Sequence, residues 1–417
     1  MKKRSVVGLR VLAGIGAAAL AISACGSSGN KPASSNTTPS NSSSATPAGG
    51  SSSAPSGSPY VWGVNAELSG ELASYGDAIE QGVQAYADRA NAQGGINGRP
   101  IKVVALDNGG TESQAATVET QLATADKAIG ILGNVLSTDC TASTTVATRY
   151  QVPTACLSMV SHSPYVYSLG SDNSTSVGAD ISAAAAVSHI AHPSVALLCL
   201  NTTTDVQLRQ QFPQAVAAAG DKLATIQEVS LTSTDVSVPV SKLVASKPDV
   251  VVITDTGPGF VQIMKGLSAS GLNVPLLYID GNTNVASVVG LTNSNVYPMG
   301  ATPIIEPTDT GTFIKGYLSA LQMAGVKPTV SNINGSTLEA YLAAYAYGQA
   351  LKTCGPSCTG PRLNTQLEQT HLALGSLDPS YAWTAGDHFP FPTWYVYHLA
   401  GSTFTSVASY PATSTSS

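Results

Sequence analysis

The residues with the clearest chemical potential follow a short apolar run at 128–132. Gly133 and Asn134 begin a turn there, and Ser137 and Thr138 stand where a helix should start. Hydroxyls and unpaired backbone N–H groups at a helix start can bind a carboxylate. Asp139 would oppose such an anion, and Ser137 or Thr138 could instead cap the helix. The turn therefore predicts either an anion site or an ordinary helix cap.

Three acidic residues also follow apolar runs. They are Asp205, Asp255, which is followed by Thr256, and Asp280. A carboxylate at such a position can pair with a ligand ammonium through a charge-assisted hydrogen bond. Capping of the next helix is the alternative for each of them.

Catalytic and metal-binding patterns are missing from the sequence. The motif HExxH, a G-x-S-x-G elbow after a strand, a P-loop and a dinucleotide-binding glycine pattern are all absent. His162 lies beside the candidate site, and we expect it to be a surface-loop residue. We expect neither an enzyme nor a cofactor nor a metal; a secreted hydrolase whose triad assembles only in space is the weaker alternative. The six histidines are His162, His189, His192, His371, His388 and His398.

The elements that must position these residues alternate between strand and helix. Apolar runs predict strands, and a 3.6-residue apolar period predicts helices. The predicted strands are 61–66, 101–106, 128–132, 153–157, 194–200, 224–229, 249–253, 274–279, 296–299 and 394–398. The predicted helices are 77–92, 111–125, 138–150, 177–190, 206–219, 236–245, 260–270, 310–324 and 337–351.

This alternation is typical of parallel α/β sheets with right-handed crossovers. So many strands exceed what one open sheet usually holds. We therefore expect an α/β fold with two doubly wound parallel-sheet lobes. Ligands of such sheets bind beyond the carboxyl ends of the strands.

The first residues have the pattern of an export signal. Lys2, Lys3 and Arg4 precede an apolar run at 6–21, which is too short for a membrane anchor. Ile22-Ser23-Ala24-Cys25 resembles a bacterial lipobox. We expect a signal peptide at 1–24 and a diacylated Cys25 that holds the protein on the outer face of the cell membrane. Ordinary cleavage after Ala24 is the alternative.

Residues 25–58 form a Ser- and Pro-rich segment that cannot bury enough apolar surface to fold. We interpret it as a disordered tether with a mean reach of about 30 Å. Only 11% of the 417 residues are charged, and removal of the signal leaves 15 Lys and Arg against 25 Asp and Glu, a net charge of −10. This charge argues against a nucleic-acid partner. Beyond residue 30 no apolar run is long enough to span a membrane.

Several motifs resemble one family. They are Leu68-Ser69-Gly70, Ser74-Tyr75-Gly76-Asp77, the run from Asn91 to Ile101 that contains Gly94-Gly95-Ile96-Asn97-Gly98-Arg99, and Asp107. Together they resemble the N-terminal lobe of leucine/isoleucine/valine-type binding proteins, the extracytoplasmic receptors of ABC importers with the type I periplasmic-binding fold. Weaker similarity extends over most of residues 60–400.

The resemblance implies three hinge crossovers between the lobes, near 171–176, 300–304 and 384–390. Lobe 1 would then comprise 59–172 and 304–385, and lobe 2 would comprise 175–300 and 388–413. Ligand binding would close the lobes by a hinge motion, driven by higher affinity for the closed form.

The resemblance also assigns ligand contacts. The similar family turn binds the ligand α-carboxylate, which implies this role for Ser137 and Thr138. Ser158 and Ser161 match a second contact point, or else lie in a polar loop. Tyr75 matches a tyrosine of the family's cleft, although it could equally be a core residue. The tyrosines that the family often carries in lobe 2 are missing, so an amino acid, an amide or another small carboxylate all remain possible ligands.

Six cysteines occur, and one of them is Cys25. A Cys354–Cys358 disulfide is expected in an exported protein, because CxxxC without further Cys or His is a poor zinc motif. Cys140 could pair with Cys156. Cys199, within an apolar strand, is then the free thiol.

We predict a monomeric, lipid-anchored solute-binding receptor that delivers a small amino-acid-like ligand to an ABC permease. The alternative is a sensor domain of the same fold that regulates a partner.

Overall fold

The structure is a computed structural model. It describes residues 55–159, 162–170, 176–201, 203–230, 233, 235–254, 258–279, 295–375, 377 and 381–412. Residues 51–417 form one compact unit. Cys25 with its predicted lipidation, the signal peptide and most of the tether lie outside the described residues.

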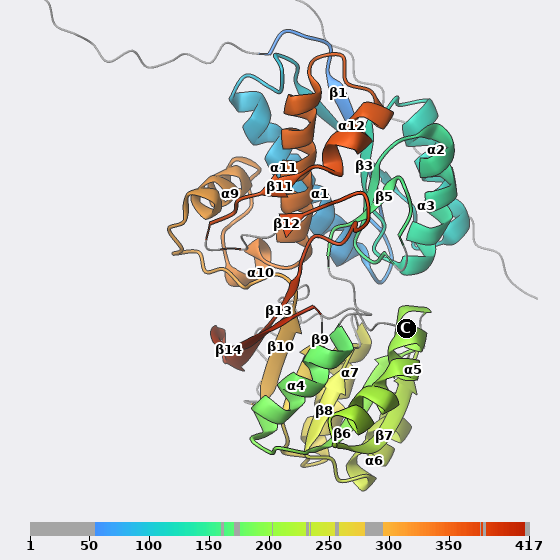
Figure 1. Ribbon diagram of the computed structural model, residues 1–417, viewed down its shortest axis with the longest axis vertical. Coiled ribbons are helices and arrows are strands. Elements are labelled where there is room, and N and C mark those ends of the chain that lie inside the picture. The colour runs from blue at the N-terminus through green and yellow to red at the C-terminus, as the bar shows by residue number, and fades with distance from the viewer. Residues whose placement is uncertain are drawn as a thin grey trace, which may run out of the picture. The chain divides into compact units, whose positions relative to one another are not determined.

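The first sheet is parallel throughout and has the strand order β2-β1-β3-β4-β5. Helices α1 and α11 pack together on one side of it, and α2 and α3 pack together on the other (Figure 1). The strands are β1 (Tyr60–Ala66), β2 (Ile101–Asp107), β3 (Gly130–Gly133), β4 (Thr154–Cys156) and β5 (Val166–Ser168). The helices are α1 (Ala73–Ala92), α2 (Glu112–Thr124), α3 (Ser137–Tyr150), α9 (Thr312–Met323), α10 (Val330–Ile333), α11 (Ser336–Cys354) and α12 (Gly360–Leu367).

The second sheet has the order β14-β13-β10-β9-β8-β6-β7. Its strands are β6 (Ser194–Leu200), β7 (Lys222–Val229), β8 (Val250–Ile253), β9 (Leu276–Ile279), β10 (Val296–Gly300), β13 (Thr393–Ala400) and β14 (Thr403–Pro411). Its helices are α4 (Ser176–Ser188), α5 (Thr203–Ala218), α6 (Ser237–Ala245) and α7 (Pro258–Ala269). A two-stranded sheet joins β11 (His371–Leu372) to β12 (Tyr381–Ala382).

Helices cover both faces of the second sheet. Along β6, Val195, Leu197 and Cys199 belong to the core cluster beneath α4 and α5. The alternate residues of the same strand belong to the core cluster beneath α6 and α7. A strand buried on both faces is apolar at every position, which is why the sequence predicts β6 so clearly. The parallel α/β prediction is confirmed for the first sheet and for five strands of the second, β10-β9-β8-β6-β7.

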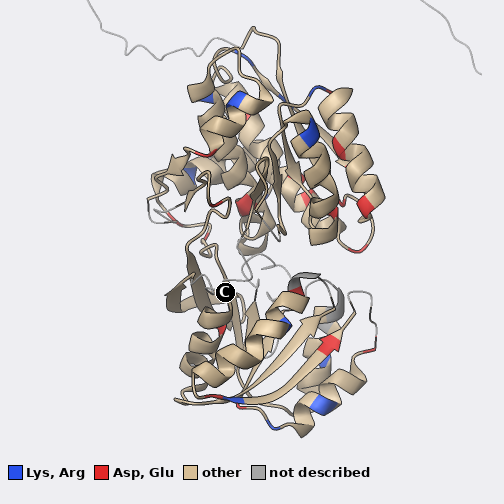
Figure 2. Ribbon diagram, turned by 45° about the vertical axis from the view of Figure 1, so that its right-hand side comes forward, with Lys and Arg blue, Asp and Glu red and all other residues tan. Residues whose placement is uncertain are grey.

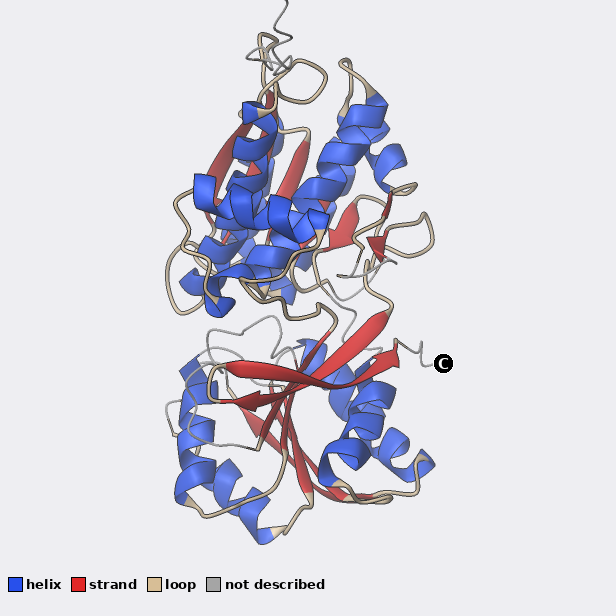
Figure 3. Ribbon diagram, turned by 90° about the vertical axis from the view of Figure 1, so that its left-hand side faces the viewer, coloured by secondary structure: helices blue, strands red, loops and turns tan. Residues whose placement is uncertain are grey.

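One edge of the second sheet differs from the expectation. β13 pairs antiparallel with β10, and β14 pairs antiparallel with β13 (Figure 3). The sequence predicts a strand within β13 but misses β14, β5 and α12. β14 is an edge strand with an exposed polar face, and β5 has only three residues. Both therefore lack the long apolar run that marks a buried strand.

The Gly94–Arg99 motif forms a tight turn between α1 and β2. Gly94, Gly95, Asn97 and Gly98 all have positive φ, and Ile96 pairs with Arg99 across the turn. A Cβ at Gly95 would collide with the carbonyl oxygen of Arg99. The motif is thus a structural requirement of this connection.

Helices α1 and α11 approach closely because Gly82 has no side chain. A Cβ there would collide with the carbonyl oxygen of Thr337. Around this contact, Trp62 of β1 stacks on Tyr86 of α1 at 5.8 Å between ring centroids and meets Tyr347 of α11 edge-on at 6.1 Å. Large rings buried on three elements fix the packing of this side of the sheet.

Charged residues are sparse and scattered over helices, strands and loops (Figure 2). Within the described residues, no helix is both long and apolar enough to cross a bilayer. The chain changes from one sheet to the other three times, through 169–175, 301–311 and 383–392. Residues 171–175 of the first connection lie outside the described part.

Candidate functional site

The C-terminal edge of the first sheet carries the turn that the sequence singles out. β1 and β3 are parallel neighbours, with Asn65 opposite Gly133. The residues that follow the two strands therefore leave the sheet side by side. A Cβ at Gly133 would collide with the carbonyl oxygen of Asn65, and Asn134 adopts the left-handed conformation, with φ 48°. The turn into α3 is thus fixed by close backbone contact with β1.

Glu67 follows β1 and inserts its side chain into this turn. Its Oε2 accepts a hydrogen bond from the N–H of Val135 at 2.9 Å, and its Oε1 accepts one from the N–H of Leu136 at 3.1 Å. The Glu67 side chain is fully buried. These N–H groups lie just before α3, where the sequence predicts free donors. In the structure, both N–H groups donate to the Glu67 carboxylate.

Asp139 lies beside Glu67 in the first turn of α3. It is fully buried, and the two carboxyl groups interact directly. Burial raises the pKa of Glu67 to about 7, although the two N–H donors oppose the shift, and burial also raises the pKa of Asp139. Two carboxyls that touch in a buried site favour a state in which one of them holds a proton.

Ser137 and Thr138 lie at the start of α3 as predicted. The N-cap residue is Leu136, and it makes no side-chain cap bond. Ser137 is buried, and the Thr138 hydroxyl donates to Asp139 Oδ1 at 3.2 Å. Neither residue is the N-cap.

Ser158 follows β4 at the same edge and is partly exposed. The neighbouring Leu157 N–H is held by the carbonyl oxygens of Gly133 and Asn134 at 3.0 and 3.1 Å. A disulfide between Cys140 of α3 and Cys156 of β4 fastens the same region. The structure thus brings Ser158 close to the turn after β3. Ser161, its predicted companion, lies outside the described residues.

Tyr75 lies in the first turn of α1. Only 7% of its surface is exposed, and it belongs to the core cluster of the first sheet. This placement fits the core role, one of the two alternatives that the sequence leaves open.

Asp205 lies in the first turn of α5, at the C-terminal edge of the second sheet. It is buried and accepts a hydrogen bond from the hydroxyl of Thr254, the residue after β8. This contact joins the ends of two neighbouring strands, β6 and β8. Asp255, Thr256 and Asp280 lie outside the described residues.

A buried polar cluster behind the turn escapes sequence reasoning. Asn65 Nδ2 donates to Glu119 Oε2 at 2.8 Å, and the Thr154 hydroxyl donates to Glu119 Oε1. Asn108 Nδ2 donates to Asn65 Oδ1 at 3.1 Å, and Asn134 Nδ2 donates to Ser143 Oγ at 3.1 Å. The one sequence feature that could have indicated this cluster is Glu119 on the buried face of α2. Recognising that feature requires knowing which face of the helix is buried.

His162 is exposed, and its ring lies 4.4 Å from that of His388. His388 is buried, and its Nδ1 contacts the carbonyl oxygen of Val166 at 2.7 Å. Burial lowers the pKa of His388. Among the described residues, no group of three or more His, Cys, Asp and Glu could hold a metal ion.

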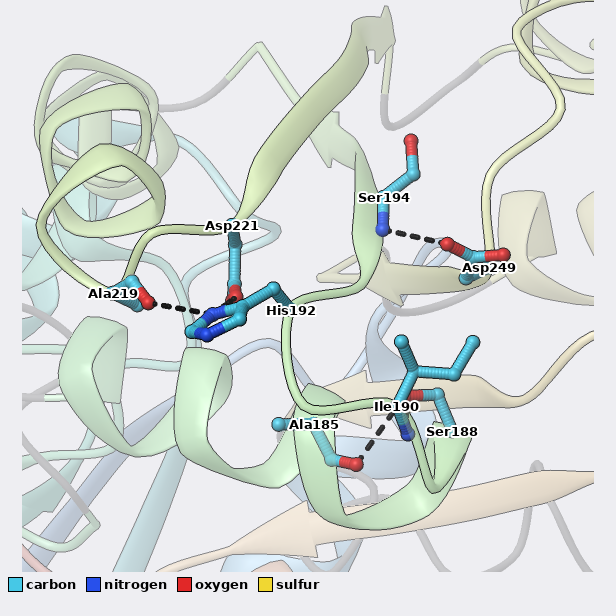
Figure 4. Close-up of polar contacts among 8 residues, drawn as sticks. All are labelled: Ala185, Ser188, Ile190, His192, Ser194, Ala219, Asp221 and Asp249. Carbon is cyan, nitrogen blue, oxygen red and sulfur yellow. Dashed lines mark hydrogen bonds and ion pairs between the residues drawn. The ribbon is translucent and has the colours of Figure 1, made fainter.

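The opposite, N-terminal edge of the second sheet uses its polar groups locally (Figure 4). His192 Nδ1 lies 3.4 Å from Asp221 Oδ1 and 3.1 Å from the carbonyl oxygen of Ala219. Asp249 Oδ2 accepts a hydrogen bond from the N–H of Ser194 at 2.8 Å. These contacts connect neighbouring loops to one another. The polar groups at the C-terminal edges of the two sheets remain as the candidate site.

Two further cysteines, Cys354 and Cys358, form a second local disulfide at the end of α11. Cys199 is a buried free thiol in β6. Burial raises the pKa of Cys199 to about 12, so it stays protonated at neutral pH.

Two α/β sheets joined by three connections, with the candidate polar groups at the C-terminal ends of the strands, define the class of the type I periplasmic-binding fold. A family model described as periplasmic binding protein matches residues 60–403, and the chain belongs to this family. The resemblance predicted from the motifs is thereby confirmed. The family consists of binding proteins, in agreement with the prediction that the chain is not an enzyme.

Two curated relatives match short segments of the chain. An amino acid binding protein of Pseudomonas aeruginosa is 39% identical over 77 residues, which is 18% of this chain and 21% of the relative. A Leu/Ile/Val-binding protein homolog 2 of Brucella abortus is 41% identical over 56 residues, 13% of this chain and 15% of the relative. The chain therefore spans about a fifth or less of the length of these relatives.

Solved structures match over nearly their whole length. A solute-binding protein of an ABC transporter from R. palustris, in complex with 4-hydroxybenzoate, has a TM-score of 0.72 and 14% identity, over 85% of this chain and 98% of that one. A branched-chain amino acid transporter substrate-binding protein from Streptococcus pneumoniae, in complex with isoleucine, has a TM-score of 0.66 and 20% identity, over 85% and 99%. At these identities the likeness shows the fold.

Proposed function

We propose that this protein is the extracytoplasmic receptor of an ABC importer and binds a small, amino-acid-like molecule between two lobes. The match of the periplasmic binding protein model to residues 60–403 carries the proposal. The ligand would contact the C-terminal edges of both sheets, near Ser137, Thr138 and Ser158 on one side and Asp205 on the other. Asp255, Thr256, Asp280 and Ser161 remain candidate contacts on the evidence of the sequence.

The three connections between the sheets support closure by a hinge. The lobes would be 59–172 with 304–385 and 175–300 with 388–413. A ligand that touches both lobes stabilises the closed form by its higher affinity for that form. Delivery of the ligand to an ABC permease would follow closure, and the receptor would act as a monomer.

We further propose that Cys25 is lipidated and that residues 25–58 hold the folded part off the membrane. Detergent partitioning and mass spectrometry of the protein from its native host test this step. The Cys25→Ser variant should leave the membrane fraction and lack the acyl mass. Recovery of that variant in the membrane fraction would contradict the anchor.

Thermal-shift screening of the purified protein tests the receptor function. Amino acids, amides, small carboxylates and sugars form the panel. Binding to the native state alone raises the melting temperature, by an amount that grows with ligand concentration above Kd. Ligand turnover would indicate an enzyme instead. A panel without any hit, together with binding to a signalling partner, would favour a sensor.

A further inference from the structure

Glu67 occupies the position at which the sequence predicts a ligand carboxylate. Glu67 and Val135 each lie two residues beyond the paired Asn65 and Gly133, where β1 and β3 leave the sheet side by side. The Glu67 carboxylate accepts hydrogen bonds from the N–H groups of Val135 and Leu136 at 2.9 and 3.1 Å. Its side chain is fully buried. The two backbone donors before α3 are therefore satisfied before any ligand arrives.

The surroundings of Glu67 disfavour an anion further. Asp139 touches Glu67 and is also fully buried, so negative charge lies at the start of α3. A carboxylate near this helix start would meet like charge instead of the favourable end of the helix dipole.

The described residues that directly follow the strands carry no positive charge that could offset this negative charge. Among the described residues within three positions after each parallel strand of the two sheets, none is Lys or Arg. About half of the side chains there carry a hydrogen-bond acceptor or a hydroxyl, such as Glu67, Ser158 and Thr254. Such edges suit a ligand that donates hydrogen bonds.

We propose that Glu67 is a specificity-determining residue that excludes carboxylates from the turn after β3 and selects a ligand with an amide or amine group at this end. The inference rests on the proposed receptor function. The sequence leaves an amino acid, an amide or another small carboxylate open as the ligand. The inference excludes those that would place an anionic group at this turn.

The first test compares ligands that share a carbon skeleton. Calorimetry on the full protein would use leucine, leucinamide and isopentylamine, and then benzoate, benzamide and benzylamine. In at least one set, the amide or amine should bind about tenfold or more tightly than the carboxylate. A carboxylate that binds more tightly than its amide and amine, and loses affinity in Ser137→Ala, would overturn the proposal.

The second test asks whether Glu67 holds an anion position. In Glu67→Ala the N–H groups of Val135 and Leu136 lose their acceptor. Acetate should then raise the melting temperature in a saturable manner, while chloride of equal ionic strength should not. The wild type and the matched control Glu67→Gln, which keeps an acceptor oxygen there, should not respond to acetate. A folded Glu67→Ala variant that ignores acetate would overturn the proposal.

A third measurement tests the proposal if the Glu67→Ala variant does not fold. Glu67→Gln removes the charge but keeps the shape, so the preference for amide over carboxylate should fall by about tenfold. An unchanged preference would overturn the role of Glu67. If no compound of either set binds the wild type, the proposed receptor function fails for these ligands, while the acetate response of Glu67→Ala still decides whether Glu67 fills the anion position.

Discussion

Glu119 shows how one buried residue links the stability of this protein to pH. Its two carboxyl oxygens accept hydrogen bonds from Asn65 and Thr154, and its side chain is fully buried in α2. Burial raises the pKa of Glu119 from its ordinary value of 4.5 to about 7. The folded state thus holds a proton that the unfolded chain releases at lower pH.

The first prediction follows from this shift. Below about pH 4.5 both states are protonated, and as pH rises through 7 the folded state must ionise a buried group. The free energy of unfolding should therefore fall between pH 5 and pH 8, as measured by urea denaturation. Glu67, whose pKa shifts in the same direction, adds to the fall.

Glu119→Gln is the variant that checks this cause. An amide has no proton to lose, and the Thr154 hydroxyl can rotate to accept from it. The cost at pH 5 should be about 1 kcal/mol or less, and the fall toward pH 8 should shrink. Equal pH dependence in the variant and the wild type would contradict the assignment to Glu119.

At the scale of elements, the contact between α1 and α11 depends on Gly82. The second prediction is that Gly82→Ala lowers the free energy of unfolding by about 1–3 kcal/mol, because the added methyl group meets the backbone of α11. Urea denaturation measures the change. Gly386→Ala is the matched control, since a Cβ there meets nothing within 4 Å. A loss as large in the control would show that the helix contact is not the cause.

The two disulfides should differ in their contribution to stability. Cys140–Cys156 links residues 16 apart and joins α3 to β4, whereas Cys354–Cys358 links residues only 4 apart. By the chain-entropy relation, the first bond contributes about 3 kcal/mol and the second about 2 kcal/mol. The third prediction is that Cys140→Ser with Cys156→Ser lowers the melting temperature more than Cys354→Ser with Cys358→Ser. The reverse order in calorimetry would contradict this ranking.

At the scale of the whole molecule, the folded part begins earlier than composition suggests. The sequence assigns residues up to 58 to the tether. In the structure, however, the N–H of Ser56 donates to the carbonyl oxygen of Gly98 at 3.2 Å. Arg99 Nε donates to the carbonyl oxygen of Ser58, and Arg99 lies over the Tyr60 ring at 3.8 Å. The end of the tether thus packs on the turn between α1 and β2.

The fourth prediction concerns this boundary. A fragment of residues 55–417 should melt at a higher temperature than one of residues 60–417, because only the longer fragment keeps the carbonyl oxygens of Ser58 and Pro59 that accept from Arg99. Differential scanning calorimetry compares the two. Arg99→Lys in the longer fragment is a control that removes the forked contact but keeps the charge, and it should lower the melting temperature toward that of the shorter fragment. Equal melting of the two fragments would place the boundary after residue 59.

The α/β class, the family and the positions of most strands along the chain could be predicted from the amino-acid sequence. From Val195 to Leu200, β6 is buried on both faces and is apolar at every position, and the Gly94–Arg99 turn needs its glycines for local backbone reasons. Both signals lie within short stretches of chain, so they can be read without the fold. Edge elements such as β14 escaped because their solvent-facing residues carry no such pattern.

The arrangement at the turn after β3 depends on tertiary packing. Glu67 and Val135 are 68 residues apart, and no local pattern relates them. Parallel pairing of β1 with β3 brings them together, and the same pairing builds the buried cluster of Asn65 and Glu119. The sequence therefore predicted a helix start that could bind an anion. In the structure, the pairing of β1 with β3 places the Glu67 carboxylate at this helix start instead.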